Sequence, residues 1–250
     1  MQKLIVHPLL TDIIDHAILT ETEGIESYRV SASIYTVIGF QFSGQIHHME
    51  ENRPLDTLGV TGILDRWRPF RSEAATRSLL IFLKPGGFYR IFGAVAGSLK
   101  SNSLALADVT SVDMKQTFND ILMATGHISE KWNRLQERFL KLVCRNLSPE
   151  SQGALYFLQT QKGLLRIESI AKNLGVSRRT LERKFMTEIG TSPKHLARIF
   201  RWENALRNLG NSSDLGTTAL ECGYFDQAHF VRESQNLSGT SPKKLKLLGF

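Results

Sequence analysis

Cysteine is scarce in this sequence, with Cys144 and Cys222 the only two among 250 residues. Two cysteines cannot build a disulfide framework for a chain of this length, and we expect both side chains to be buried rather than redox-active. Long apolar runs are also missing, since none approaches the roughly 20 residues that a membrane helix requires. The segment Met1 to Pro8 is too short and too interrupted for a signal peptide. These absences predict a cytoplasmic protein without a membrane partner.

Patterns typical of enzymes and metal sites are absent as well. His47 and His48 are adjacent, so on a strand they point to opposite faces, whereas a metal site on a sheet needs imidazoles that share a face. No Lys-Ser/Thr pair follows Gly86-Gly87 at the spacing of a phosphate-binding loop. No Ser-His-Asp or Cys-His set can be assembled from the sequence. We therefore expect no enzyme activity, no metal and no cofactor.

Positive charge is concentrated in the last part of the chain. Residues 149–250 hold 15 Lys and Arg against 9 Asp and Glu, and residues 1–148 hold 16 against 15. The last part therefore carries +6 of the net charge of +7. Such a patch attracts phosphates without regard to base sequence, which favours a nucleic-acid partner. A solvated basic face and a scaffold that binds only protein are the alternatives.

The same part of the chain contains a repeat. Gly190-Thr191-Ser192-Pro193-Lys194 returns unchanged as Gly239-Thr240-Ser241-Pro242-Lys243, 49 positions later. In the first copy, a short helix from about Arg166 to Leu174 ends at Gly175, and Ser177 caps a helix from Arg178 to about Ile189. A helix, a glycine turn and a capped basic helix form the helix-turn-helix arrangement.

The second copy repeats this arrangement. A helix from Leu215 to Glu221 precedes Gly223, and Asp226 caps a helix from Gln227 to about Leu237. Between the copies, Ser192-Pro193 opens a linking helix that continues to about Leu209 and holds the two units in a fixed relation.

The second unit departs from the first at positions that we expect to be buried. Thr218 stands where the first copy has Ile170, and Ser234 stands where it has Phe185. Because a buried Phe contributes roughly 1.5–3 kcal/mol, we expect the second unit to be the less stable one and Ser234→Phe to stabilise it.

A long ordered series of residues in both copies is similar to one known family. The matching residues are Leu174 to Phe185, Gly190, Ser192-Pro193, Ala219, Gly223 to Gln227, His229-Phe230, Arg232, Gly239 and Ser241-Pro242. Through them, the segment from about Ile167 to Leu248 resembles the DNA-binding domain of AraC-type transcriptional regulators. In that family two helix-turn-helix units place their recognition helices in successive major grooves, and activation is the commoner mode.

The resemblance implies which side chains meet DNA. They are Arg178, Arg179, Glu182, Arg183, Gln227, Ala228, His229 and Arg232, with Ser177 and Asp226 as helix caps. Base contacts would come from Arg179, Glu182, Arg183, Gln227, Ala228 and Arg232. Arg suits guanine, Gln adenine, Glu cytosine and Ala the thymine methyl group. A phosphate contact is the alternative for Arg183 and Arg232, and an intrahelical pair with Arg178 or Arg179 is the alternative for Glu182.

The first half of the chain predicts strands and then helices. The strands are expected at Ile13 to Leu19, Tyr28 to Phe42, Gly59 to Leu64, Trp67 to Phe70 and Arg77 to Leu83. The helices are expected at Phe88 to about Val95, Asp113 to Met123 after Ser111, and Ile128 to Leu147. Short strands of this kind predict an antiparallel barrel or sandwich. The element order and Leu83-Lys84-Pro85-Gly86-Gly87-Phe88 resemble the cupin-like sensor half of a subset of AraC-type regulators.

The sequence thus predicts an α+β protein of two domains. Residues 1–147 would form a sensor or oligomerisation domain, and residues 148–250 an all-α DNA-binding domain whose opening helix begins at Ser148-Pro149. The helix Ile128 to Leu147 could either pack on its own domain as a lid or form a dimer seam. Double-stranded DNA is the expected partner, and RNA polymerase, a small-molecule effector and a second copy of the chain are further partners that this interpretation allows.

Overall fold

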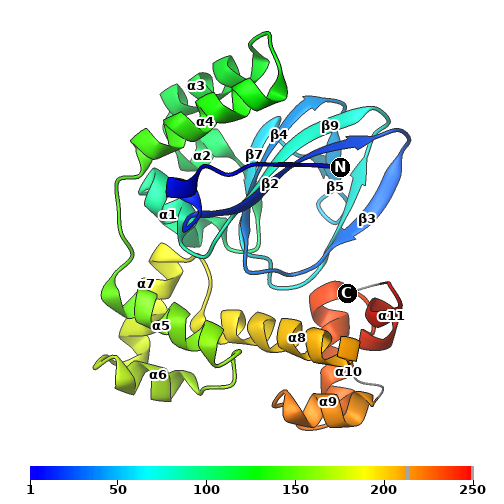
Figure 1. Cartoon of the computed structure of the whole chain (residues 1–250), viewed down its shortest axis with the longest axis vertical. Coiled ribbons are helices and arrows are strands. Elements are labelled where there is room, and N and C mark those ends of the chain that lie inside the picture. The colour runs from blue at the N-terminus through cyan, green and yellow to red at the C-terminus, as the bar shows by residue number, and fades with distance from the viewer. Residues whose placement is uncertain (212–213, 249–250) are drawn as a thin grey trace.

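The computed structural model describes residues 1–211 and 214–248, and the side chains of residues 112, 113 and 211 lie outside the description. The predicted domain end at residue 250 therefore lies outside the described residues. A sheet domain with its own helices stands above a helical domain, and the long helix α8 (Pro193–Asn211) runs across the helical domain (Figure 1). The part of the chain that is described contains no helix long and apolar enough to cross a membrane.

The N-terminal domain contains two antiparallel sheets. The larger has the strand order β1 (Gln2–Leu4), β2 (Ile14–Thr22), β9 (Thr76–Leu83), β4 (Thr36–Ser43), β7 (Leu58–Thr61) and β10 (Ser103–Ala105). The smaller has the order β3 (Glu26–Val30), β8 (Arg68–Ser72), β5 (Ile46–His48) and β6 (Arg53–Pro54). The sheets do not close on each other, so the domain is a sandwich rather than a barrel. The strands β1, β5, β6 and β10 were not expected from the sequence because each has only two or three residues.

The run Tyr28 to Phe42, expected as one strand, is divided between the two sheets. The chain leaves the small sheet after β3 and enters the large sheet at β4. Within β4, Ile38 and Phe40 are both 2% exposed and point into the core. In the connecting segment the amide of Ala32 donates to the carbonyl of Leu237 in the helical domain (2.7 Å). A contact this distant in sequence cannot be read from local propensity.

Helices pack against one face of the large sheet. They are η1 (Pro8–Leu10), α1 (Gly87–Phe92), η2 (Ala96–Leu99), α2 (Leu106–Val109), α3 (Val112–Met123) and α4 (Ile128–Leu142). Trp132, Leu135 and Phe139 of α4 are at most 2% exposed. The Trp132 indole donates to the carbonyl of Ile5 (2.6 Å). The apolar stripe of α4 is therefore buried in its own domain, as the lid alternative predicts, although the helix ends at Leu142 and not at Leu147.

The two cysteines lie in different environments. Cys222 is fully buried, and the side-chain amides of Asn204 and Asn208 donate to its Sγ (3.4 and 3.3 Å). Burial raises the pKa of the Cys222 thiol. Cys144 is exposed because α4 ends two residues before it. The expectation of burial was wrong for Cys144.

The helical domain has seven helices among the described residues. They are α5 (Pro149–Thr160), α6 (Ile167–Asn173), α7 (Arg178–Glu188), α8, α9 (Leu215–Glu221), α10 (Gln227–Ser238) and α11 (Pro242–Leu247). Ser148 caps α5 by accepting from the amide of Ser151 (3.3 Å). Ile199 and Ala205 of α8 are fully buried and Trp202 is 5% exposed. The linking helix therefore lies in the middle of the domain core and joins the two units, as its apolar spacing predicts.

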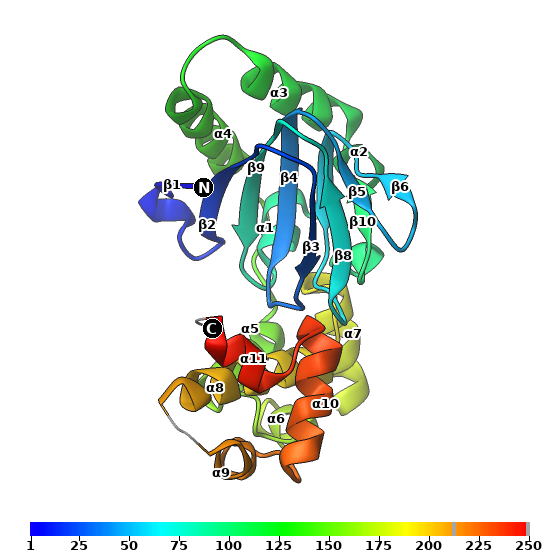
Figure 2. The ribbon, with the colours of Figure 1, turned by 90° about the vertical axis from the view of Figure 1, so that its right-hand side faces the viewer.

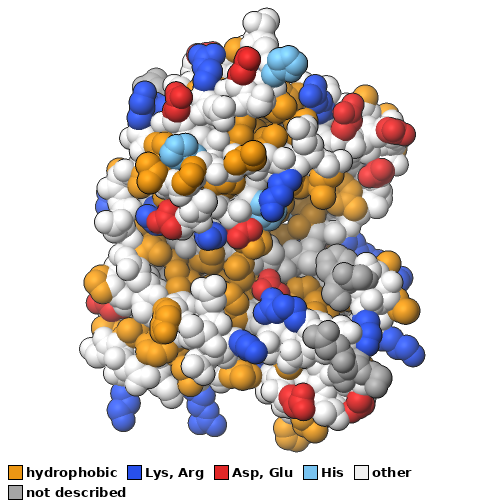
Figure 3. Space-filling model, in the orientation of Figure 1, with side chains coloured by type: hydrophobic (Ala, Val, Ile, Leu, Met, Phe, Trp, Pro, Cys, Tyr) orange, Lys and Arg blue, Asp and Glu red, His pale blue; other side chains and the backbone are white. Residues whose placement is uncertain are grey.

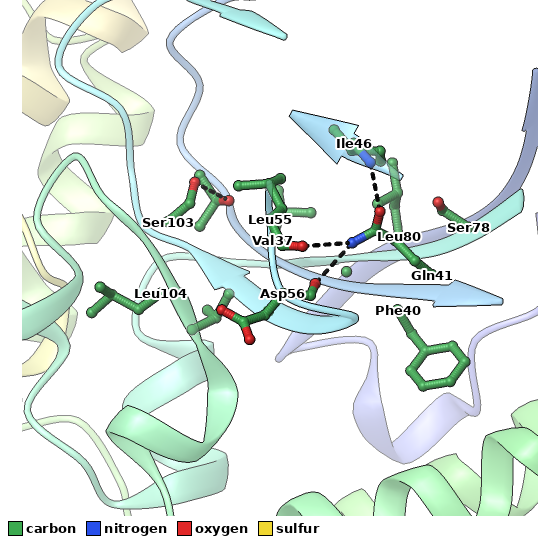
Figure 4. A pocket seen from close by; sticks show the side chains of 14 residues that line it. Val37, Phe40, Gln41, Ile46, Leu55, Asp56, Ser78, Leu80, Ser103 and Leu104 are labelled. Atoms are coloured by element: carbon green, nitrogen blue, oxygen red, sulfur yellow. Dashed lines mark hydrogen bonds between the residues drawn. The ribbon is translucent and has the colours of Figure 1, made fainter. Parts of the chain in front are cut away.

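A small cavity lies between the sheets of the N-terminal domain (Figure 4). Its volume is about 60 Å³, and its lining includes Val37, Phe40 and Leu80. The Gln41 side chain accepts from the amide of Ile46 (2.7 Å) and donates to the carbonyls of Leu55 and Asp56, as the dashed lines in Figure 4 show. These bonds satisfy the amide group of a side chain that is only 7% exposed.

Candidate DNA-binding surface

The first helix-turn-helix unit consists of α6, a glycine turn and α7. Gly175 in the turn has φ 67°, and Ser177 accepts from the amide of Thr180 (3.1 Å) as the cap of α7. On the inner side of α7, Leu181 and Phe185 are fully buried in the core of the helical domain. Because one face is buried, the polar face of α7 must point outward.

The second unit consists of α9, a glycine turn and α10. Asp226 caps α10 by accepting from the amide of His229 (2.6 Å). Phe230 and Leu237 on α10 are fully buried, and Ala219 on α9 packs in the same core. The repeat in the sequence therefore corresponds to a repeat in the structure.

Two polar residues occupy the core of this second unit. Ser234 is fully buried, and its hydroxyl donates to the carbonyl of Thr240 (2.8 Å). Thr218 is 1% exposed, and its hydroxyl donates to the carbonyl of Asp214 (2.7 Å). Each hydroxyl therefore has a partner, and each position is already enclosed. The expectation that Phe at position 234 would fill missing volume has no support from this packing.

The charged face of α7 is partly neutralised within the protein. Arg178 donates to the carboxylate of Glu182 (2.8 Å) and forms a second ion pair with Glu168. The intrahelical pairing of Glu182 with Arg178 is thus the arrangement of the protein without DNA. Arg179 and Arg183 are exposed, and neither has an ion pair or a side-chain hydrogen bond within the described part of the chain. These two guanidinium groups are the available donors of the first unit.

The corresponding face of α10 is open at three of four expected positions. Gln227, Ala228 and Arg232 are exposed, and Arg232 has no ion-pair partner among residues 1–211 and 214–248. His229 is half-buried. Its Nδ1 accepts from the amide of Phe225 (3.3 Å), and its ring packs edge-on against the ring of Tyr224. His229 therefore has a packing role in the turn, in addition to the DNA contact that the resemblance implies for it. Phe225 itself is 85% exposed beside the cap of α10.

The N-terminal domain touches the C-terminal end of α10. Besides the bond from Ala32 to Leu237, the Arg29 guanidinium donates to the carbonyl of Gly239 (2.9 Å) and stacks over the Trp67 ring at 4.8 Å. In Figure 2 the lower ends of β3 and β8 lie next to α10. These bonds hold the end of the helix that is opposite to its cap.

The same domain also touches the C-terminal end of α7. The segment η2 packs so closely there that a Cβ on Gly97 would lie 2.9 Å from the carbonyl oxygen of Met186. A Cβ on Gly190 would lie 2.7 Å from the carbonyl oxygen of Ala96. The N-terminal domain thus contacts both units at the ends away from their caps, which leaves the cap ends open.

His195 of α8 is buried in the same interface between the domains. Its Nε2–H donates to the carbonyl of Leu64 (2.9 Å), and its side chain is 9% exposed. Burial lowers the pKa of His195 from its ordinary value, and the nearby Arg198 guanidinium acts in the same direction. The hydrogen bond to Leu64 is the largest effect that opposes this shift, and Asp65 and Glu233 also oppose it. A neutral imidazole is therefore the form that this interface favours.

The histidines of the small sheet are not brought together into a metal site. His47 pairs with Glu73 (3.0 Å), whereas His48 is 3% exposed and packs edge-on against Phe70. They face different partners, as expected for neighbours on a strand. In the described ranges no three His, Cys, Asp or Glu side chains are placed to hold a metal ion.

Comparison with known proteins gives one family match. Residues 170–247 match the family model of a helix-turn-helix domain. No curated protein sequence matches the chain. The structure of ToxT from Vibrio cholerae O395 bound to (E)-4-(8-methylnaphthalen-1-yl)but-3-enoic acid is 8% identical, with a TM-score of 0.50, over 93% of this chain and 98% of that one. That likeness shows the same fold.

Two smaller structures are similar to the helical domain. The C-terminal domain of AraT, a response regulator from Geobacillus stearothermophilus, is 29% identical with a TM-score of 0.39, over 42% of this chain and 88% of that one. A transcriptional regulator with an AraC-type DNA-binding domain from Chromobacterium violaceum is 28% identical with a TM-score of 0.37, over 40% of this chain and 90% of that one.

The fold and the family match define the class of protein. A tandem pair of capped helices on one linking helix is the architecture of a DNA-binding domain, and the match covers both units. The C-terminal domain is an AraC-type helix-turn-helix domain, and the chain is a DNA-binding transcriptional regulator.

Proposed function

We propose that this protein binds specific DNA sequences by placing α7 and α10 in two successive major grooves of a duplex. The observation that carries this proposal is that the cap ends of both helices are open while their opposite ends are covered by the N-terminal domain. Lys and Arg side chains, blue in Figure 3, project from the left part of the edge of the helical domain that is farthest from the sheets, and acidic and hydrophobic side chains lie at its right part. Residues near the start of a recognition helix are the ones that reach base edges.

The exposed side chains on α7 and α10 are the groups that would contact bases in this proposal. Arg179 and Arg183 of the first unit and Gln227 and Arg232 of the second are exposed, and their donors match guanine and adenine edges. Ala228 suits a thymine methyl group. Glu182 can accept from a cytosine through the carboxylate oxygen that Arg178 does not occupy. Residues 1–147 and 148–250 would be the regulatory and DNA-binding domains.

Selection of bound sequences from a random duplex pool tests this function. We expect a motif of two boxes about one helical turn apart, with guanine prominent in both. Arg179→Ala and Arg183→Ala should each relax choice in the first box only, and Arg232→Ala should relax choice in the second box only. Recovery of no motif, or of a single box that all three variants alter alike, would contradict the proposal.

We further propose that a small-molecule effector controls DNA binding. The cavity inside the sandwich, at about 60 Å³, is far below the roughly 300 Å³ at which ligand pockets begin. A cleft of about 470 Å³ between the domains is large enough, and its lining includes Ile34 and Lys84 of one domain and Phe200 of the other. Hydrophobic side chains, orange in Figure 3, are exposed along this boundary beside charged ones. The lining also includes Asp12, Asp15 and Arg90, and Arg90 pairs with Asp12 (2.8 Å). The apolar wall and the Lys84 ammonium are the parts of the cleft that would suit an amphipathic carboxylic acid, the kind of compound bound to the ToxT structure of the same fold.

Binding of such a compound can be measured directly. A medium-chain fatty acid should raise the Tm of the wild-type protein, and Lys84→Ala should remove most of that rise because it removes the ammonium. Equal stabilisation of wild type and Lys84→Ala would place the compound elsewhere. Sedimentation of residues 1–147 would test dimerisation, and a reporter fused to the selected motif, with RNA polymerase as the responding partner, would test activation.

A further inference from the structure

A groove of about 480 Å³ lies along α8 between the two helix-turn-helix units. It is lined by Gly163, Leu164, Leu165, Arg166, Ile167, Glu168, Arg178, Lys194, Ala197, Arg198, Arg201, His229 and Glu233. Arg178 begins α7 and His229 lies in the first turn of α10. The groove therefore joins the cap ends of the two helices proposed to read bases.

The groove has an excess of positive charge that the protein does not neutralise. Five of its lining residues are Lys or Arg and two are Glu. Each Glu already has a partner, since Glu168 pairs with Arg178, and Glu233 binds the Arg198 guanidinium through two bonds of 2.9 Å. Arg166, Lys194 and Arg201 are the cations left over.

These three cations have no anionic partner among the described residues. Arg166 and Lys194 are exposed, and no ion pair involves either of them. Arg201 is half-buried, its guanidinium lies over the Tyr224 ring at 5.3 Å, and its Nε has no hydrogen-bond partner in the described structure. Lys194 and Arg201 are seven positions apart on α8, so they lie on one face of the helix. The apolar spacing of the sequence predicts α8 only as a linking helix, whereas Lys194 and Arg201 are the residues in the sequence that could have indicated its cationic face.

The groove is also held at a fixed width. Gly163 packs against α8 so closely that a Cβ there would lie 2.1 Å from the carbonyl oxygen of Ala197. The Leu164 side chain contacts the turn of the second unit, since a Cβ on Gly223 would lie 2.6 Å from the Cδ2 of Leu164. Both walls are therefore fixed to α8 and to each other. A rigid charged groove loses little conformational entropy when a ligand enters it.

We infer that this groove binds phosphates along the minor groove that lies between the two major grooves, with Arg166, Lys194 and Arg201 as the phosphate-binding residues. This inference rests on the proposed function. When two helices enter successive major grooves on one face of a duplex, the minor groove and the phosphate backbones along its two edges lie between them. The groove lies between the two helices, opposite that minor groove, and is cationic, as a duplex backbone requires. Phosphate contacts set the register of the protein on DNA without choosing bases.

Salt-dependent binding to the selected duplex tests the inference. The slope of log Kd against log salt should change by about 0.9 for each phosphate contact removed. Between about 50 and 200 mM salt, wild-type affinity should therefore fall roughly 3.5-fold further than that of Lys194→Ala, and roughly 12-fold further than that of Lys194→Ala/Arg201→Ala. Arg207→Ala is the matched control because Arg207 is an exposed cation of the same helix that lines a different surface, beside Glu203.

Neutral methylphosphonates placed between the two boxes identify the ligand. They should weaken wild type and Arg207→Ala but have little further effect on the double variant. Arg201→Ala also removes the contact with Tyr224, so Arg201→Lys, which keeps the charge, serves as the check on folding. The motif selected by Lys194→Ala should equal that of wild type.

The outcomes separate the two proposals. Specific binding with unchanged salt slopes in Lys194→Ala and the double variant would overturn the groove inference and leave the proposed function standing. Absence of any specific duplex binding by wild type would overturn both. Stabilisation of wild type by inorganic phosphate that depends on Lys194 and Arg201, without a methylphosphonate effect, would assign the groove to a small anion and overturn its role in DNA binding.

Discussion

Gly163→Ala should destabilise the helical domain, because the loop before α6 lies directly against α8 at this residue. Gly163 has φ 72°, so any side chain there enters the left-handed region at a cost of roughly 1–2 kcal/mol. Its Cβ would also lie 2.1 Å from the carbonyl oxygen of Ala197, below the 3.0 Å that real Cβ contacts respect. Because that oxygen belongs to the backbone of α8, the helix or the loop must move by about 0.9 Å. Overpacking of this kind adds roughly 1–3 kcal/mol.

Gly175 provides the matched control for this substitution. It has φ 67°, and a Cβ there would meet nothing within 4 Å. Gly175→Ala should therefore lower the free energy of unfolding of the helical domain by roughly 1–2 kcal/mol, and Gly163→Ala by roughly 2–5 kcal/mol. Urea unfolding followed by the fluorescence of buried Trp202 and by circular dichroism measures both.

The two glycine variants should also differ in DNA binding. Gly163 forms part of the wall of the groove between the units, so a shift there should weaken specific binding under conditions in which the variant is fully folded. Gly175→Ala should bind with nearly wild-type affinity under the same conditions. Equal losses of stability, or a larger loss in Gly175→Ala, would refute the reasoning from close approach.

Changes at Arg183, Ser234, His195 and Cys144 have outcomes that can be measured separately. Arg183→Ala should lose roughly 1–3 kcal/mol of specific binding and relax one base position, and equal weakening on all sequences in a gel-shift series would mean that it contacts phosphate. Ser234→Phe should destabilise the protein by roughly 1–3 kcal/mol because the site is enclosed and its hydroxyl is bonded, which a raised Tm would contradict. Because burial depresses the pKa of His195, the unfolded chain binds more protons than the folded protein, and the free energy of unfolding should fall as pH drops below about 6.5. His195→Gln should flatten this dependence of stability on pH. An identical pH profile in the variant would exclude His195 as the source of the dependence. Iodoacetamide should modify exposed Cys144 and spare buried Cys222 in the native protein, with mass spectrometry of the peptides as the measurement.

The helical domain could be predicted closely because its signals are local. Ser148, Ser177 and Asp226 each cap a helix where the sequence places them, and α9 has the predicted bounds, Leu215 to Glu221. Caps, glycine turns and spacings of three and four residues act within one or two helical turns. The N-terminal domain was predicted less well, because its strands are short and their pairing joins residues far apart in sequence.

The partners of particular side chains could not be predicted from the sequence pattern. Glu182 could face DNA or its own helix, and the structure without DNA pairs it with Arg178. Ser234 appeared to be a loss of core volume relative to the first unit, but the backbone of the turn around Thr240 closes on it and accepts its hydroxyl. Both outcomes depend on how neighbouring segments pack, which a comparison of two repeats in one sequence does not contain.

The sequence by itself determined the repeat, the two capped helices, the linking helix and the excess of positive charge in the last 102 residues, because periodicity, caps and charge are properties of the chain. Tertiary structure alone decided that Ala32 and Trp67 meet the end of α10, that Leu164 joins one unit to the other, and that Arg166, Lys194 and Arg201 share one groove without a counter-charge. The physical reason is distance along the chain. Contacts between segments separated by tens or hundreds of residues depend on the packing of whole domains, which local preference does not encode.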